Sequence, residues 1–307
     1  MYQLLLLFAA VISTYLVGAA QFTEEFQIVE TAPGVYVHFG AQEEISAENL
    51  GDIANIGFIV GDDSVIVIDT GGSLAVGKNL YKKMREITGL PVKYIVHTHI
   101  HPDHVFGVKA FEQENAQLVG HERLANAVVQ RGDFYTQRLL DIIGDAAQGS
   151  KTILPDLTVN DSLEIDLGNR IVTVSAFPTA HTDNDLIVFD QKTQTLWTGD
   201  LLFIERTPSL DGSIVGWLDA IEKLESIPAK RVIPGHGPVS TDWPNALHAQ
   251  QHYLQIIADG TREAIRSRQS IQHATETVGV SEQHKWLLFD TYNPHNVTKS
   301  FSELEWE

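Results

Sequence analysis

The sequence predicts an α+β fold in which two β-sheets pack on each other and helices cover their outer faces. Three observations lead to this prediction: short β-type segments alternate with helical ones, the alternation occurs twice along the chain, and no low-complexity linker or repeat interrupts it. Because each strand-rich half is closed by helices, a layered arrangement with the sheets inside is expected. With 307 residues, 43% of them hydrophobic, the chain can bury such a core.

The first half of the chain supplies the first set of strands. Residues 34–40, 55–72 and 92–99 are rich in β-branched and aromatic residues, with a turn expected at residues 61–63. Residues 73–89 predict a helix, because they open with a capping serine, keep apolar residues at helical spacing and end at a glycine shortly before a proline.

The second half repeats this alternation. Residues 162–177 predict a hairpin, residues 185–190 and 195–200 predict two more strands, residues 212–228 predict a helix, and residues 230–238 predict a strand that runs into a loop. The pattern therefore indicates a second sheet with its own helices.

Three other segments complete the chain. Residues 121–149 are helical and charged, as expected of an insertion beside a site, and residues 243–276 are again helical. Residues 296–307 form a short, acidic tail. We expect one domain over residues 21–307, with a C-terminal helical extension.

The start of the chain predicts an export signal. Residues 4–17 are apolar, and Gly18 and Ala20 suit the positions that flank signal-peptidase cleavage. We therefore expect a signal peptide over residues 1–20, a periplasmic or secreted protein, and no membrane association after cleavage. Because no Lys or Arg precedes Leu4, a retained anchor helix is the alternative, although the apolar run is shorter than a comfortable membrane span.

Composition excludes several classes of site and partner. The chain has no cysteine, so disulfides and thiolate metal sites are excluded, and any metal must be held by histidines and carboxylates. The formal net charge is -19, from 40 acidic and 21 basic residues. No local basic patch offsets this charge, so a nucleic-acid partner is not expected.

One short run concentrates side chains that bind metals. Residues 94–107, "YIVHTHIHPDHVFG", place four histidines and an aspartate within eight positions. In an extended segment alternate residues project to the same side, so His99, His101 and Asp103 can point into one pocket, while His104 turns in as a helix starts. A single histidine here would be a surface or hydrogen-bonded residue. Four of them after a strand indicate a metal site.

Three more ligand types follow apolar runs further along the chain: His181 after "VSAFPTA", Asp200 at the end of "TLWTGD", and His236 in "VIPGHGP". Each alone would be structural, as a turn residue, a cap and a loop histidine respectively. Together they complete the ligands of two metal sites.

These motifs resemble a known family. "HTHIHPDH", "AHTDND", "TGDLLF" and "PGHGP", in this order, resemble the metallo-β-lactamase fold superfamily, whose pattern is H-x-H-x-D-H followed by distant His, Asp and His. The resemblance covers about residues 34–238 and implies a four-layer αβ/βα sandwich. It implies two metal sites that share one carboxylate: His99, His101 and His181 at the first, Asp103, His104 and His236 at the second, and Asp200 between them.

A narrower resemblance extends over nearly the whole mature chain. "HPDHVFG", "AHTDNDL", "LWTGDLLF", "LDGSIVGWL" and "ELEWE" are similar to the quinoprotein relay system zinc metallohydrolases, exported bacterial proteins associated with pyrroloquinoline-quinone dehydrogenases. This resemblance implies a periplasmic quinoprotein dehydrogenase as a partner.

The resemblance implies a hydrolase. Two metals about 3.5 to 4 Å apart produce a hydroxide near neutral pH, which would attack the carbonyl of a small-molecule ester, thioester or lactone. One metal would stabilise the oxyanion, and Asp103 or Asp200 would orient the nucleophile or take its proton. Carboxylates beside imidazoles suit two Zn²⁺ ions, and iron or manganese would also fit.

Alternative functions remain open at this point. Antibiotic-hydrolysing relatives lack a bridging aspartate, which disfavours a β-lactamase-type amide hydrolase, and the acidity of the chain disfavours a nuclease. An alternative of another class is a non-catalytic accessory protein that binds metal and a quinone for a partner dehydrogenase. Turnover of a substrate panel distinguishes it from an enzyme.

Several residues near these motifs have two interpretations. Asp69 would order the metal loop, as the resemblance implies, or act as a turn aspartate. His97 and His121 are expected to be structural, because the family pattern starts at His99.

Other candidates lie further along the chain. Arg206 and Asp211 could contact an anionic substrate, although pairing of Arg206 with a carboxylate is favoured, and Trp217 could form an apolar wall. His248 and His252 have helical spacing but no third ligand nearby, so we expect them to be exposed.

Overall fold

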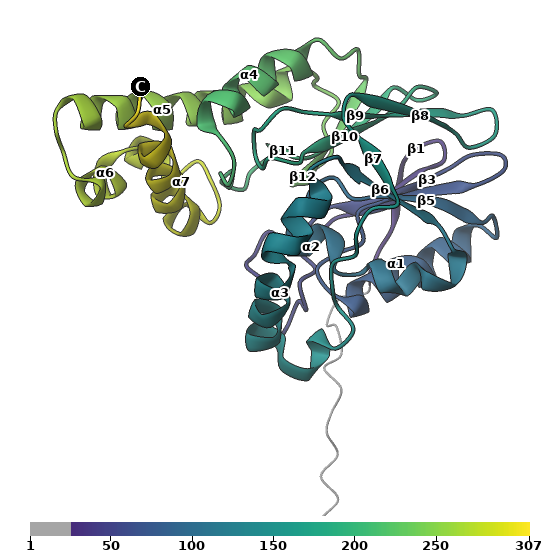
Figure 1. Cartoon of the computed structure of the whole chain (residues 1–307). Helices are drawn as coiled ribbons and strands as arrows, with labels where there is room; N and C mark the ends of the chain where they lie inside the picture. The colour runs from purple at the N-terminus through teal and green to yellow at the C-terminus, as the bar shows by residue number, and fades with distance from the viewer. Residues whose placement is uncertain (1–25) are drawn as a thin grey trace, which may run out of the picture.

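The computed structural model of the chain describes residues 26–307. The signal peptide predicted for residues 1–20 lies outside the described residues. Two β-sheets face each other, helices cover their outer faces, and a C-terminal group of helices extends to one side (Figure 1). The predicted α+β fold is confirmed.

The first sheet contains seven strands in chain order. Neighbours are antiparallel from the first to the fourth strand and parallel from the fourth to the seventh. The strands are β1 (Val29–Ala32), β2 (Val35–His38), β3 (Ile56–Val60), β4 (Val65–Ile68), β5 (Val92–Val96), β6 (Gln117–His121) and β7 (Leu157–Val159). The sequence did not predict β1, β6 or β7, which are short or follow other apolar segments.

The second sheet has five strands in the order β12-β11-β10-β9-β8, with a parallel pair at one edge. The strands are β8 (Ser162–Asp166), β9 (Ile171–Ala176), β10 (Leu186–Asp190), β11 (Thr195–Phe203) and β12 (Arg231–His236). The predicted hairpin and strands are confirmed, but the strand predicted over residues 195–200 continues to Phe203.

The two sheets bury a shared apolar layer. Val35, Ile66 and Val96 of the first sheet and Trp197 and Ile233 of the second belong to one buried cluster. Each such side chain, when fully buried, contributes about 1.5 to 3 kcal/mol to folding. This layer fixes the two sheets relative to each other, and with them the loops at their edges.

Helix α1 (Leu74–Ile87) covers the outer face of the first sheet and begins as its sequence predicts. The Ser73 hydroxyl accepts a hydrogen bond from the Val76 amide at 3.3 Å, which caps the helix. Val76, Leu80 and Met84, spaced by four, form its buried face.

The remaining helices surround the edges of the sheets. They are α2 (Pro102–Val105), α3 (Leu124–Ile143), α4 (Ile214–Glu225), α5 (His248–Arg266), α6 (Ile271–Thr277) and α7 (Phe289–Leu304), with short 3₁₀ turns at Val108–Glu114, Gly144–Ala147, Asn245–Leu247 and Val280–Glu282. The segment described from sequence as a short acidic tail, residues 296–307, is mostly the second half of α7. None of the helices in residues 26–307 combines the length and apolar character needed to cross a membrane.

Helix α7 is tied to the start of α4 through one carboxylate. Glu303 accepts hydrogen bonds from the Ser213 hydroxyl at 2.6 Å and from the Ile214 amide at 2.8 Å. The Ile214 amide is one of the donors at the N-terminus of α4 that the helix backbone leaves unpaired. The Glu303 carboxylate therefore joins α7 to the N-terminus of α4.

We expect Glu303→Ala to lower the free energy of unfolding by about 1 to 2 kcal/mol, because capping donors lose their acceptor. Chemical denaturation monitored by circular dichroism measures this change. Glu305→Ala is the control, since Glu305 is exposed on the same turn. Equal stability of the two variants would show that the contact with α4 contributes nothing.

Candidate metal centre

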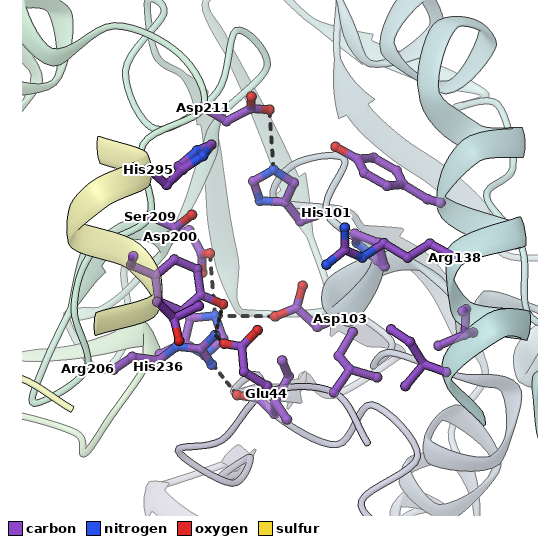
Figure 2. A pocket seen from close by; sticks show the side chains of 18 of the residues that line it. Glu44, His101, Asp103, Arg138, Asp200, Arg206, Ser209, Asp211, His236 and His295 are labelled. Carbon is purple, nitrogen blue, oxygen red and sulfur yellow. Dashed lines mark hydrogen bonds and ion pairs between the residues drawn. The ribbon is translucent and has the colours of Figure 1, made fainter. Parts of the chain in front are cut away.

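The candidate ligands lie where strands of both sheets end at a common edge. Residues 97–104 follow β5, His181 lies between β9 and β10, Asp200 lies within β11, and His236 ends β12. The central apolar layer brings these strand ends together, so side chains up to 137 positions apart, such as His99 and His236, share one site. Figure 2 shows several of them around the pocket.

Two glycines make room for Asp200. Gly199 has a φ of 50°, a left-handed conformation that interrupts the regular register between β11 and β12. A Cβ atom on Gly235, in the neighbouring strand, would overlap Oδ1 of Asp200. These glycines explain how an aspartate fits inside a buried strand.

Three imidazole nitrogens meet at the first group of ligands. His101 Nδ1 lies 3.1 Å from His99 Nε2 and 2.9 Å from His181 Nε2. Oδ2 of Asp200 lies 3.6 Å from the His99 nitrogen and 3.4 Å from the His181 nitrogen. These four residues can surround one metal ion.

The second group consists of Asp103, His104 and His236. Asp103 Oδ2 lies 3.7 Å from His104 Nε2 and 3.3 Å from His236 Nε2. Asp200 also faces this group: its Oδ1 is 3.1 Å from His104 Nε2, and its Oδ2 is 3.4 Å from His236 Nε2. The Asp200 carboxylate thus contacts both groups.

The outward nitrogens of the rings face oxygen atoms. His181 Nδ1 is 2.5 Å from the Ser209 carbonyl, and His236 Nδ1 is 2.8 Å from the Ile53 carbonyl. His101 Nε2 is 3.4 Å from Oδ2 of Asp211. A carbonyl or carboxylate only accepts hydrogen bonds, so the outward nitrogens of His101 and His181 carry the hydrogen. His236 Nδ1 also lies 3.2 Å from Arg206 Nη1, but the Ile53 carbonyl is closer and assigns the hydrogen to this nitrogen too. Each inward nitrogen then presents its lone pair.

Asp69 orients the rings of His104, directly, and His99, through Thr98. It accepts hydrogen bonds from the Thr98 amide and hydroxyl, both at 2.8 Å, and its Oδ2 lies 2.8 Å from His104 Nδ1. Because the Thr98 hydroxyl donates to Asp69, its oxygen can accept from His99 Nδ1 at 3.0 Å. Asp69 therefore acts on the cluster, and is more than a turn aspartate.

The lowered pKa values of His99 and His181 favour neutral rings at these two ligands of the first group. Burial lowers the pKa of His181 to about 3, so the ring is unprotonated at neutral pH. Burial alone would lower the pKa of His104, but Asp200, Asp103 and Asp69 raise it well above its usual value. The second group therefore attracts a positive charge, which a metal ion can supply in place of a proton.

The residues present fit a pair of metal ions. Five inward lone pairs and two carboxylates cannot satisfy one another with hydrogen bonds, since all are acceptors. His104 Nε2 and Asp200 Oδ1 are buried and have no hydrogen-bond partner among the described residues. Unpaired buried polar atoms of this kind are costly unless an ion completes them.

A pocket of about 480 Å³ opens beside the cluster, within the size range of small-molecule sites. Its walls come from the loop before β3, from α3, from the segment after β11 and from α7 (Figure 2). It is lined by Glu44, Ile45, Ile53, His101, Pro102, Asp103, Phe134, Tyr135, Arg138, Leu139, Ile142, Asp200, Phe203, Arg206, Ser209, Asp211, His236, Thr291, Tyr292 and His295.

Arg206 lines this pocket, and its guanidinium is paired with Glu44 and Tyr292. It lies 3.5 Å from a Glu44 carboxylate oxygen and donates a hydrogen bond to the Tyr292 hydroxyl at 2.7 Å. The prediction that it pairs with a carboxylate is confirmed. Glu44 and Tyr292 themselves were not predicted, because their roles depend on a contact between the two ends of the chain.

Trp217 and Asp211, which the sequence offered as an apolar wall and a substrate contact, make other contacts in the structure. Trp217 does not line the pocket: it is buried, donates a hydrogen bond to the Leu201 carbonyl at 3.1 Å, and packs 5.3 Å from the His181 ring. Asp211 contacts His101, Arg131 and Lys299.

The other histidines lie outside the two ligand groups. His97 is buried, and His121 accepts a hydrogen bond from the Arg123 amide at 3.0 Å, so neither joins them. His248 and His252 are exposed, as predicted.

Comparisons with known proteins agree with this architecture. The sequence model of the metallo-beta-lactamase superfamily matches residues 50–236. A metallo-beta-lactamase from Pontibacter korlensis has a solved structure with a TM-score of 0.60 at 21% identity, covering 75% of this chain and 98% of that chain. At this identity the likeness shows the fold, and it confirms the four-layer αβ/βα sandwich.

Two curated relatives are similar in sequence. A linear primary-alkylsulfatase of Pseudomonas sp. is 27% identical over 215 residues, which is 58% of this chain and 40% of that protein. A beta-lactamase-like protein 2 homolog of Caenorhabditis elegans is 24% identical over 175 residues, 57% of this chain and 52% of that protein. The chain thus spans about half of each relative or less.

Proposed function

This chain belongs to the metallo-beta-lactamase superfamily, and we propose that it is a two-metal hydrolase of a small ester, thioester or lactone. Members of this superfamily are metal-dependent hydrolases. The seven residues proposed to hold the metals are His99, His101, Asp103, His104, His181, Asp200 and His236.

One observation carries the proposal: a buried carboxylate that faces two groups of inward imidazole nitrogens beside an open pocket. A purely structural metal site is closed, whereas a catalytic one leaves space for substrate. This arrangement therefore supports catalysis over storage or structural binding.

The chain's own residues would divide the work. His99, His101 and His181 would hold one ion, Asp103, His104 and His236 the other, and Asp200 would contact both. When bound, the two ions supply an activated water and stabilise developing negative charge. Zinc suits this donor set, and iron or manganese would also be accepted.

Asp103 is the residue proposed to handle the proton. Both carboxylates line the pocket, but the Asp103 side chain is 12% exposed and the Asp200 side chain, surrounded by histidines, is 4% exposed. Asp103 can therefore orient a water beside the substrate and accept its proton. Asp200 is the alternative acceptor, and its position favours holding the two groups together.

A substrate panel with purified protein tests the proposal. Metal content is measured first, and then hydrolysis of esters, thioesters, lactones and nitrocefin. Turnover of a carbonyl ester or thioester that stops with a chelator and returns with zinc supports the proposal. Turnover of nitrocefin alone would instead support a β-lactamase-type amide hydrolase.

A sulfate ester is a second candidate substrate, because the chain is similar to a linear primary-alkylsulfatase and the pocket has an apolar wall. The panel therefore includes linear alkyl sulfates. Their hydrolysis without turnover of any carbonyl ester would replace the first proposal.

The cellular setting is also proposed. The apolar start of the chain suggests export to the periplasm or outside the cell, with removal of residues 1–20. The motifs shared with quinoprotein relay proteins suggest a periplasmic quinoprotein dehydrogenase as a partner. If no panel compound is hydrolysed while a quinone or such a dehydrogenase binds tightly, the non-catalytic accessory role replaces the hydrolase.

We expect Asp69→Asn to weaken metal binding about 10- to 100-fold, because the charged acceptor that orients His104 and Thr98 is lost. Competition with a chromophoric chelator measures this change. Asp63→Asn, on an exposed turn of the same sheet, serves as the control. Affinity within twofold of the unaltered protein would show that Asp69 does not support the cluster.

A further inference from the structure

Helix α3 places an arginine without a partner in the pocket. Arg138 lines the pocket, and its side chain makes no hydrogen bond or ion pair within residues 26–307. Figure 2 shows its side chain pointing from the helix into the pocket. The other arginine of the lining, Arg206, is already occupied by Glu44 and Tyr292. Arg138 is therefore the lining guanidinium that remains available to a ligand.

Apolar side chains flank Arg138 on the same face of α3. Phe134 lies four residues before it and Ile142 four residues after it, so the three share one helix face. All three line the pocket, and Phe134 is 63% exposed. Ile45 and Leu139 continue this wall. The face spans about 12 Å along the helix, long enough to cover an extended chain.

The other charged residues of the pocket indicate which ligands Arg138 can bind. The chain carries a net charge of -19, and the pocket contains Asp103, Asp200, Asp211 and Glu44. These carboxylates are already engaged: Glu44 pairs with Arg206, Asp211 pairs with Arg131 and Lys299, and Asp103 and Asp200 are proposed metal ligands. Arg138 offers an anionic ligand one complementary contact next to the candidate metal ligands, with apolar surface on both sides.

We propose that the substrate is an anionic amphiphile whose negative group, a few bonds from the reacting carbonyl, pairs with Arg138. Its apolar acyl chain lies along Phe134 and Ile142. This inference rests on the proposed hydrolase function and specifies the class of substrate. Arg138 and Phe134 determine specificity and take no part in bond breaking.

Matched thioesters test the proposal. S-octanoyl mercaptoacetate carries a carboxylate near the thioester, its primary amide is the neutral equivalent, and S-acetyl mercaptoacetate lacks the chain. Hydrolysis adds water across the C–S bond and releases the carboxylic acid and a thiol. Because the protein has no cysteine, a thiol reagent follows the reaction without background from the protein.

The unaltered protein should show a kcat/KM at least about tenfold higher for the anionic octanoyl thioester than for its neutral equivalent, as one charge-assisted hydrogen bond provides. It should be at least about tenfold higher than for the acetyl compound too, because the longer chain buries more apolar surface. Arg138→Gln should abolish the preference for charge and keep the preference for chain length. Phe134→Ser should reduce the preference for chain length and keep the preference for charge. Arg266→Gln, on the exposed face of α5, should change neither.

A binding measurement separates failure of this inference from failure of the hydrolase. S-octyl mercaptoacetate, a thioether that cannot be hydrolysed, should bind in calorimetry and bind at least about tenfold more weakly to Arg138→Gln. Weaker binding to Arg138→Gln would support the proposed ligand class even if no thioester were hydrolysed. In that case only the proposed hydrolase function would be rejected. Equal binding to both proteins, or equal hydrolysis of the charged and neutral thioesters, would overturn the inference.

Discussion

Replacing Asp200 by asparagine is expected to lower kcat/KM by about a thousandfold or more and to reduce the number of metal ions retained by each chain. Several kcal/mol of metal-dependent transition-state stabilisation depend on the centre, and each 1.36 kcal/mol is a tenfold change in rate. The effect is large because Asp200 is the carboxylate that faces both ligand groups.

The pKa of Asp200 supports this expectation. Burial would raise it, but the surrounding imidazoles, His236 and His104 foremost, hold it well below its usual range. Asparagine keeps the shape and removes the charge. Metal content and steady-state kinetics measure the result, with Asp219→Asn on the exposed side of α4 as the control. Activity within tenfold of the unaltered protein would show that Asp200 is dispensable to the centre.

The second large effect concerns stability. Arg170 Nε and Nη2 donate to the two Asp190 oxygens at 2.9 and 2.7 Å, and Nη1 donates to the Val60 carbonyl at 2.8 Å. Both side chains are buried, and the contact with Val60 joins the two sheets. We expect Arg170→Met to cost about 3 to 5 kcal/mol, because it leaves a buried carboxylate without its partner.

The pH dependence of this variant follows from the pKa of Asp190. Burial would raise that pKa, but Arg170, together with hydrogen bonds from Thr193, outweighs it and keeps the pKa below its usual value. The pair therefore stabilises the fold above the unfolded pKa of about 3.9, and this contribution is lost as the pH falls through the folded pKa. In Arg170→Met the hydrogen bonds from Thr193 remain but the guanidinium is lost, so the pKa of Asp190 rises and the variant should lose less stability at pH 5 than at pH 7.

Denaturation at both pH values measures this difference. Replacing Asp190 by leucine as well should recover most of the loss, since no buried charge then remains. Arg266→Met removes an exposed ion pair with Glu263 and should change stability little. A loss in Arg170→Met no larger than in Arg266→Met would contradict the expected role of the buried pair.

The parts of the molecule set by local rules could be predicted from the sequence. Helix α1 has its cap at Ser73 and its apolar residues at helical spacing, so its bounds were readable. The candidate ligands were recognised because each follows or ends an apolar run. Strand ends of a layered fold gather at one edge, and His181 and His236 do lie beside the cluster that begins at His99.

The parts that depend on distant contacts could not be predicted. Helix α7 reaches the pocket because the Asn296 side chain bonds the backbone at Leu210 and Pro208, more than 80 positions earlier. No local pattern marks Tyr292 as a partner of Arg206. The continuation of β11 past Asp200 likewise depends on Gly199 and the neighbouring strand. The four-residue spacing of Phe134, Arg138 and Ile142 is a local pattern that places these three side chains on one face of α3.

The most direct measurement is an anomalous-difference map from crystals of the purified protein, recorded at the absorption edge of the metal that elemental analysis identifies. Two adjacent peaks are expected, one among His99, His101 and His181 and one among Asp103, His104 and His236, with Asp200 touching both. A map without peaks there, or with a single peak at any metal concentration, would contradict a paired metal centre.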